Sequence, residues 1–211
     1  MADIGIWSLC LIVGGITAGV VTLGFDRLLA REKDPASAIA MAAFSVKASL
    51  ISVGLTLGVM AIFHSVGWQF PGYLWGGLVL TLTSGLMQIG QQWNLRFAEL
   101  SVLQGSRIVT ASIFLLTMLG SAGWNWRNSN ALVTASAIAM FSGAGYSYYK
   151  SQNRRMDVSG VAGATQIWRG HFRSALVVTA SGLINRCNIS LPVMICAMMG
   201  DIVLNGEVAR A

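Results

Sequence analysis

The ionisable residues of this chain gather at the edges of five long apolar stretches. These stretches cover residues 4–25, 37–63, 73–93, 101–123 and 130–149. Each stretch reaches or exceeds the roughly 20 apolar residues that cross about 30 Å of hydrocarbon as a helix. With 55% hydrophobic and 10% charged residues, a soluble chain of 211 residues could not bury so much apolar surface. The sequence therefore predicts an all-α fold, a polytopic bundle of five transmembrane helices in a lipid bilayer.

The distribution of Lys and Arg predicts the orientation of this bundle. The first loop, DRLLAREKD, contains Arg27, Arg31 and Lys33, whereas the second loop, HSVGWQFPGY, contains neither Lys nor Arg. Because cytoplasmic loops are enriched in Lys and Arg, we expect the first loop inside and the second outside. Alternation then predicts an external N-terminus and a cytoplasmic segment 150–173.

The chain divides into three parts by composition. Residues 1–150 form the predicted bundle, residues 151–173 a polar cytoplasmic linker, and residues 174–211 a broken hydrophobic segment with the C-terminal tail. Asn185, Arg186 and Asn188 interrupt that last segment, and an unpaired Arg at mid-bilayer costs at least about 2.5 kcal/mol. We therefore expect a broken or re-entrant helix near 185–192. The alternative is a continuous span whose Arg186 faces a partner helix.

Two cations and two glutamines inside the apolar stretches form the candidate binding site. Lys47 lies about ten residues into the second stretch, and Arg107 lies near the start of the fourth. Gln88 and Gln92 are four residues apart, which places them on one face of the third helix. Because no carboxylate lies deep in the five stretches, this pocket would suit an anionic or zwitterionic solute. Alternatively, Arg107 extends to the interface, and the glutamines bond only between helices.

Several classes of function receive no support. The three cysteines lack the paired spacing of metal sites, so no metal or cofactor is expected. No Ser/His/Asp set, HExxH motif or nucleotide-binding glycine loop is present, which argues against an enzyme. The net charge of +6 lies at helix ends and not on a continuous basic face, which argues against nucleic-acid binding.

The segment GLMQIGQQWNLRFAELSVLQGSRIVTASIFLLTMLG, followed by ALVTASAIAMFSGAGYSYYKSQNRR, resembles one five-helix repeat of the drug/metabolite transporter superfamily, in its EamA-like branch. The resemblance covers residues 4–155. Residues that fall where the family pattern expects them are Gln91 or Gln92, Arg96, Ala98, Ser101, Arg107, Gly143 and Tyr146. The chain departs from the pattern at Gly105, usually a Pro, and at Gly120-Ser121, usually Gly-Glu. Members often carry two repeats, so the resemblance implies a second copy or another membrane subunit as partner.

Two functions remain open from the sequence. The leading one is a transporter that moves a small polar metabolite, anionic or zwitterionic, by alternating access as an oligomer. The other is a structural or assembly subunit of a large membrane protein complex, built on a transporter-derived bundle. The single repeat and the altered motif positions favour this second function.

Overall fold

The computed structural model describes residues 2–68, 72–97, 99–123, 129–151 and 164–198, which are almost entirely helical. The helices are α1 (Ala2–Val21), α2 (Phe25–Leu29), α3 (Pro35–Ser65), α4 (Gly72–Arg96), α5 (Leu100–Gly123), α6 (Ser129–Lys150) and α7 (Ala164–Met198). The prediction of an all-α fold is confirmed for this part of the chain. Ala98, residues 152–163 of the predicted linker and the tail from residue 199 lie outside the described residues.

Three helices contain stretches that are long and apolar enough to cross a membrane. These stretches are Ile4–Val21 in α1, Pro35–Ser65 in α3 and Leu100–Ser121 in α5. They indicate a membrane protein, and they coincide with the first, second and fourth stretches predicted from the sequence. The helices α4 and α6 coincide with the third and fifth predicted stretches, but they do not belong to this most apolar set.

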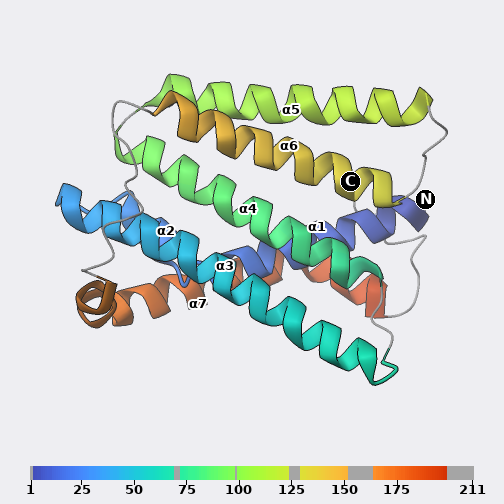
Figure 1. The fold of residues 1–211 in the computed structure, drawn as a ribbon, viewed down its shortest axis with the longest axis horizontal. Coiled ribbons are helices and arrows are strands. Elements are labelled where there is room, and N and C mark those ends of the chain that lie inside the picture. The colour runs from blue at the N-terminus through green and yellow to red at the C-terminus, as the bar shows by residue number, and fades with distance from the viewer. Residues whose placement is uncertain (1, 69–71, 98, 124–128, 152–163, 199–211) are drawn as a thin grey trace.

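Helix α4 lies at the centre of the bundle, between α1 and α6, while α5 packs mainly against α6 (Figure 1). Small residues allow the close approach of α1 and α4. A Cβ atom at Gly14 would lie 2.7 Å from Leu80 Cβ, and one at Gly77 would lie 2.7 Å from Val13 Cγ1. Larger side chains at these positions would separate the two helices, as expected for helix packing in membranes.

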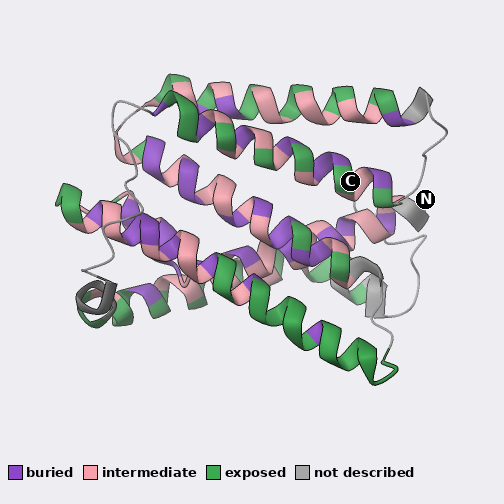
Figure 2. Ribbon diagram, in the orientation of Figure 1, coloured by how far each residue is buried: buried purple, intermediate pink, exposed green. Residues whose placement is uncertain are grey.

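A compact core forms where α2, α3, α4 and α7 meet. The buried side chains there are Phe25, Leu29, Ala38, Met41, Ala42, Ile89, Trp93 and Ala175. The aromatic rings of Phe25 and Phe44 make an edge-to-face contact at 4.9 Å, an arrangement that aromatic pairs prefer. The second half of α3 differs, because residues 54–59 and 61–68 are exposed (Figure 2), while Met60 remains buried in a small cluster with Val53 and Leu78 of α4.

Two features of the chain between α1 and α3 follow from local sequence. Gly24 precedes α2 with a φ of 69°, a left-handed conformation that glycine adopts readily. At the start of α3, Asp34 is the N-cap and Pro35 follows at the first helical position. The Asp34 Oδ2 atom accepts a hydrogen bond of 2.8 Å from the Ser37 amide, which satisfies one of the unpaired donors of the first turn.

The prediction of a helix break near 185–192 is wrong. Helix α7 continues from Ala164 to Met198 with Pro192 inside it, and its first turns occupy part of the predicted linker. A proline removes one backbone donor, but membrane helices tolerate this loss when neighbouring groups satisfy the freed carbonyl. The alternative reading, a continuous helix whose Arg186 faces a partner helix, agrees with the structure.

Candidate functional site

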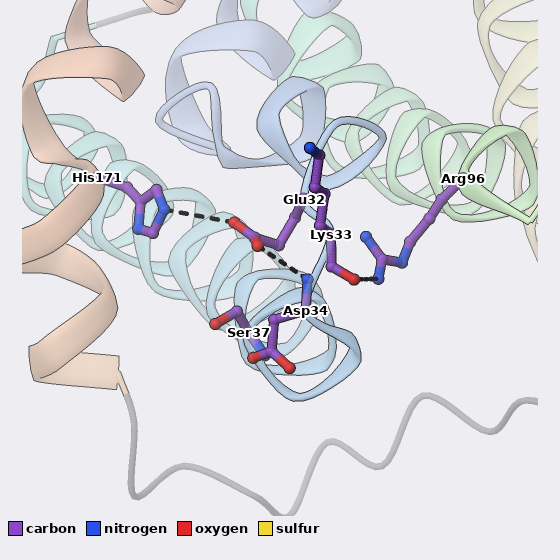
Figure 3. Close-up of polar contacts among 6 residues, drawn as sticks. All are labelled: Glu32, Lys33, Asp34, Ser37, Arg96 and His171. Atoms are coloured by element: carbon purple, nitrogen blue, oxygen red, sulfur yellow. Dashed lines mark hydrogen bonds and ion pairs between the residues drawn. The ribbon is translucent and has the colours of Figure 1, made fainter.

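The end of the bundle that contains the α2–α3 connection is held together by polar contacts from three elements (Figure 3). His171 Nε2 of α7 lies 3.4 Å from Glu32 Oε2, and the Arg96 guanidinium of α4 donates to the Lys33 carbonyl at 3.1 Å. The Glu32 carboxylate also accepts a 3.1 Å hydrogen bond from the Asp34 amide. These contacts fix the connection against both α4 and α7.

Arg186 is the charged residue that α7 presents to the bundle interior. Its Nη2 atom donates a 3.0 Å hydrogen bond to Gln88 Oε1 of α4. Its Nη1 atom is buried and has no hydrogen-bond partner among the described residues. Gly19 of α1 leaves room for this group, since a Cβ atom there would lie 3.2 Å from Nη1. The guanidinium is therefore enclosed by three helices and only partly paired.

Asp26 and Arg27 of α2 lie in the same region. The Asp26 side chain is buried, with 2% of its surface exposed, and its Oδ1 atom accepts a 2.8 Å hydrogen bond from Thr22 Oγ1. Burial raises the pKa of Asp26, and this effect outweighs the hydrogen bond from Thr22 and the charges of Arg27 and Arg186, which lower it. The region thus combines two guanidiniums with one buried carboxyl group whose pKa is raised.

Within the part of the chain that the structure describes, α1 contributes to the lining of three cavities. The largest, about 570 Å³, lies between α1, α3 and α4. It is mostly apolar, with hydroxyl groups at Thr17, Ser52, Thr56 and Thr81. A second cavity of about 250 Å³ lies between α1 and α7 and includes Arg186. The third, about 10 Å³, includes both Arg27 and Arg186 and is as small as the space that one water molecule needs.

The structure does not bring the four predicted site residues together. Lys47 is half-buried on α3 and lies on the side opposite the buried Ser45 and Ser49, because it is two residues from each at 100° per residue. Arg107 is exposed on α5. Neither residue lines any of the three cavities around α1.

Of the two glutamines, Gln88 contacts a cation, but the cation is Arg186 and not Lys47 or Arg107. Gln92 is half-buried one turn further along α4. Gln88 therefore makes a hydrogen bond between helices. Substrate binding by Lys47, Arg107, Gln88 and Gln92 stays a prediction.

Sequence reasoning did not single out Asp26 or Arg27 as site residues, because it assigned both to a solvated loop. One signal was present. Phe25, Leu28 and Leu29 have the i, i+3, i+4 spacing that predicts one buried face for this short segment, and Asp26 borders that face.

No group of three or more His, Cys, Asp or Glu side chains is placed to bind a metal ion within the described ranges. No family model, curated protein or solved structure matches the chain. The function is therefore argued from the chain's own residues.

Proposed function

We propose that this protein is a transporter-like membrane protein that moves a small anionic or zwitterionic metabolite by alternating access as an oligomer. In this proposal, α4 and α6 cross the membrane together with α1, α3 and α5. The N-terminus is external, and the α2–α3 connection is cytoplasmic, as the distribution of Lys and Arg favours.

The observation that carries the proposal is the cavity of about 570 Å³ between α1, α3 and α4. Cavities that bind small molecules have volumes of about 300–1,000 Å³, with mostly apolar walls and a few polar groups that orient the ligand. This cavity has that composition, since four hydroxyl groups lie among apolar side chains. Two of its walls, α1 and α3, contain candidate membrane spans.

The charge of the solute is inferred from the cations of the helices. The three candidate spans contain Lys47 and Arg107 but no Asp or Glu. Arg186 of α7 is a third cation, and its side chain faces the bundle interior. Cations inside membrane helices are costly and usually serve a pathway or a bound anion, so a solute with a negative group fits best.

The test is uptake by purified protein in proteoliposomes, with small carboxylates, amino acids and amines as solutes. Thr56→Phe, which fills part of the cavity, should abolish uptake of the carboxylates or amino acids. Leu57→Phe is the matched control, because Leu57 is the next residue on α3, is exposed and does not line the cavity. Equal uptake by both variants, or uptake of amines alone, would contradict the proposal.

A structural role in a larger complex is the second candidate, and one observation favours it. Gly54 and Gly58 are four residues apart on the exposed half of α3, and nothing lies within 4 Å of a Cβ atom built at either. This spacing allows close approach of another membrane helix. Purification from native membrane in mild detergent distinguishes the candidates, because a stable place in a very large assembly supports the structural role and a homodimer supports transport.

Lys47→Met gives a second distinction between the two candidates. If the protein is a transporter, this variant should fold and assemble but lose uptake of anionic solutes. If it is a structural subunit, the same variant should weaken assembly, which size-exclusion chromatography of the complex would detect.

A further inference from the structure

Arg27 of α2 and Arg186 of α7 line the same small cavity, although they are far apart in the sequence. Like charges repel at short range, so two guanidiniums on one cavity need an anionic partner. Among the described residues, the ion pair within 4.0 Å is His171–Glu32, and neither arginine takes part in it. Both arginines therefore line one small cavity, and among the described residues no carboxylate lies within ion-pair distance of either.

Asp26 is near enough for its charge to interact with both arginines, but no ion pair within 4.0 Å joins it to either of them among the described residues. Its carboxylate is buried, and its Oδ1 atom accepts a hydrogen bond from Thr22 in the turn that follows α1. Even with Asp26 ionised, the charges of Arg27, Arg186 and Asp26 sum to a positive value. The cavity is thus electropositive in either protonation state of Asp26.

The hydrogen-bond donors of Arg186 also indicate an anionic partner in this cavity. Nη2 is occupied by Gln88 Oε1, whereas Nη1 is buried with no protein acceptor in the described ranges. A buried charged donor without an acceptor is costly, and protein structures rarely leave such a group unpaired. An anionic oxygen in the adjoining cavity would satisfy it.

Glycines make the space for this arrangement. Gly182 of α7 lies so close to the Arg27 guanidinium that a Cβ atom there would overlap it. Gly19 of α1 similarly permits the approach of Arg186 Nη1. Each guanidinium can therefore lie close to the backbone of a neighbouring helix, and both residues line the same cavity.

We propose that Arg27 and Arg186 form a binding site for an oxyanion between α1, α2 and α7. The cavity of about 10 Å³ accepts a single oxygen, and the guanidinium geometry matches carboxylate and phosphate groups. The neighbouring cavity of about 250 Å³ extends from Arg186 between α1 and α7 and has room for the rest of a small ligand. The oxyanion belongs either to a free solute or to a lipid phosphate. The site goes beyond the proposed function, because an oxyanion can be bound here whether or not anything is transported.

The test compares oxyanion binding by the intact protein and its variants in a mild neutral detergent. Sodium acetate and sodium phosphate are titrated calorimetrically, with sodium chloride at equal ionic strength as the reference. In a second arm, the protein is equilibrated with phosphatidylglycerol or phosphatidylcholine, and retained lipid is counted by native mass spectrometry. The variants are Arg27→Gln, Arg186→Gln and Arg27→Lys, and the matched control is Arg31→Gln, an exposed arginine of the same connection that does not line the cavity.

Binding of acetate or phosphate that weakens about tenfold or more in both Gln variants, but not in Arg31→Gln, supports the site with a free solute as source. Retention of phosphatidylglycerol with the same dependence on the variants, without binding of acetate or phosphate, supports a lipid phosphate. Arg27→Lys keeps the charge but loses the planar fork, so it should also weaken binding, and it serves if a Gln variant fails to fold. No oxyanion binding in either arm, or equal losses in Arg31→Gln and Arg27→Gln, overturns the proposal. Uptake assays do not affect this result, so the two proposals can fail separately.

Discussion

Replacing Gln88 with Leu should test whether the α4–α7 contact is a charge-assisted hydrogen bond. The variant removes the acceptor at 3.0 Å from Arg186 Nη2, while Nη1 already lacks a partner among the described residues. A hydrogen bond to a charged group contributes about 1.5–3 kcal/mol, whereas a neutral bond between membrane helices averages about 0.6 kcal/mol. We therefore expect Gln88→Leu to lower the free energy of unfolding by about 1.5–3 kcal/mol, which corresponds to a decrease in Tm of about 3–12 °C.

Gln92→Leu is the matched control for this measurement. Gln92 lies one turn further along α4 and is half-buried, so its replacement should change stability by about 0.5 kcal/mol or less. Arg186→Met combined with Gln88→Leu should recover part of the loss, with a coupling energy of about 1 kcal/mol or more. Thermal unfolding in one detergent, followed by tryptophan fluorescence and circular dichroism, measures the wild type, Gln88→Leu, Arg186→Met, the double variant and the Gln92→Leu control. Equal shifts for Gln88→Leu and Gln92→Leu, or strictly additive effects, would refute the reasoning.

Three further predictions concern other parts of the molecule. Gly24→Ala should lower the free energy of unfolding by about 1–3 kcal/mol, because the φ of Gly24 is 69° and a Cβ atom there would lie 2.6 Å from Thr179 Oγ1. Gly58→Ala is the control, because a Cβ atom there meets nothing within 4 Å, and it should not be destabilising in the same thermal unfolding measurement. Because burial raises the pKa of Asp26 above its ordinary value of 3.8, the folded chain binds this proton more tightly than the unfolded chain. The contribution of Asp26 to stability is therefore present below pH 3.8, is lost as pH rises to the raised pKa, and should disappear from the pH dependence of Tm in Asp26→Asn. Ser129→Cys, in a background without the native cysteines, should react with an impermeant maleimide from the external side only; labelling from the cytoplasmic side alone would reverse the proposed orientation.

The positions of the long helices could be predicted from the sequence because one physical requirement determines them. Each apolar stretch must satisfy its backbone groups internally, and polar residues mark where this requirement ends. The stretch 37–63 corresponds to Pro35–Ser65, and 130–149 corresponds to Ser129–Lys150. The continuity of α7 is harder to predict from the sequence. Arg186 and Pro192 indicate a break only if no neighbouring helix provides a partner for the guanidinium.

The partners of the interior cations could not be predicted in the same way. Gln88 and Arg186 are separated by 98 positions, and hydropathy or charge counts do not indicate which helices become neighbours. Lys47 was selected because of its depth in an apolar stretch, but depth does not specify the face of the helix on which a side chain lies. The charged composition of DRLLAREKD predicts a loop at Asp26, whereas tertiary packing of Phe25 and Leu29 buries the segment.

The length of α3 has a consequence for the response of this protein to its membrane. Its 31 residues extend about 46 Å at 1.5 Å per residue, well beyond a hydrocarbon thickness of about 30 Å. In the proposed topology, a helix with this hydrophobic mismatch must tilt or emerge from the bilayer, and the tilt increases as the bilayer becomes thinner. Since α3 forms one wall of the cavity of about 570 Å³, acyl-chain length should change the width of that cavity. Lipid thickness would then regulate access to the cavity without binding in it.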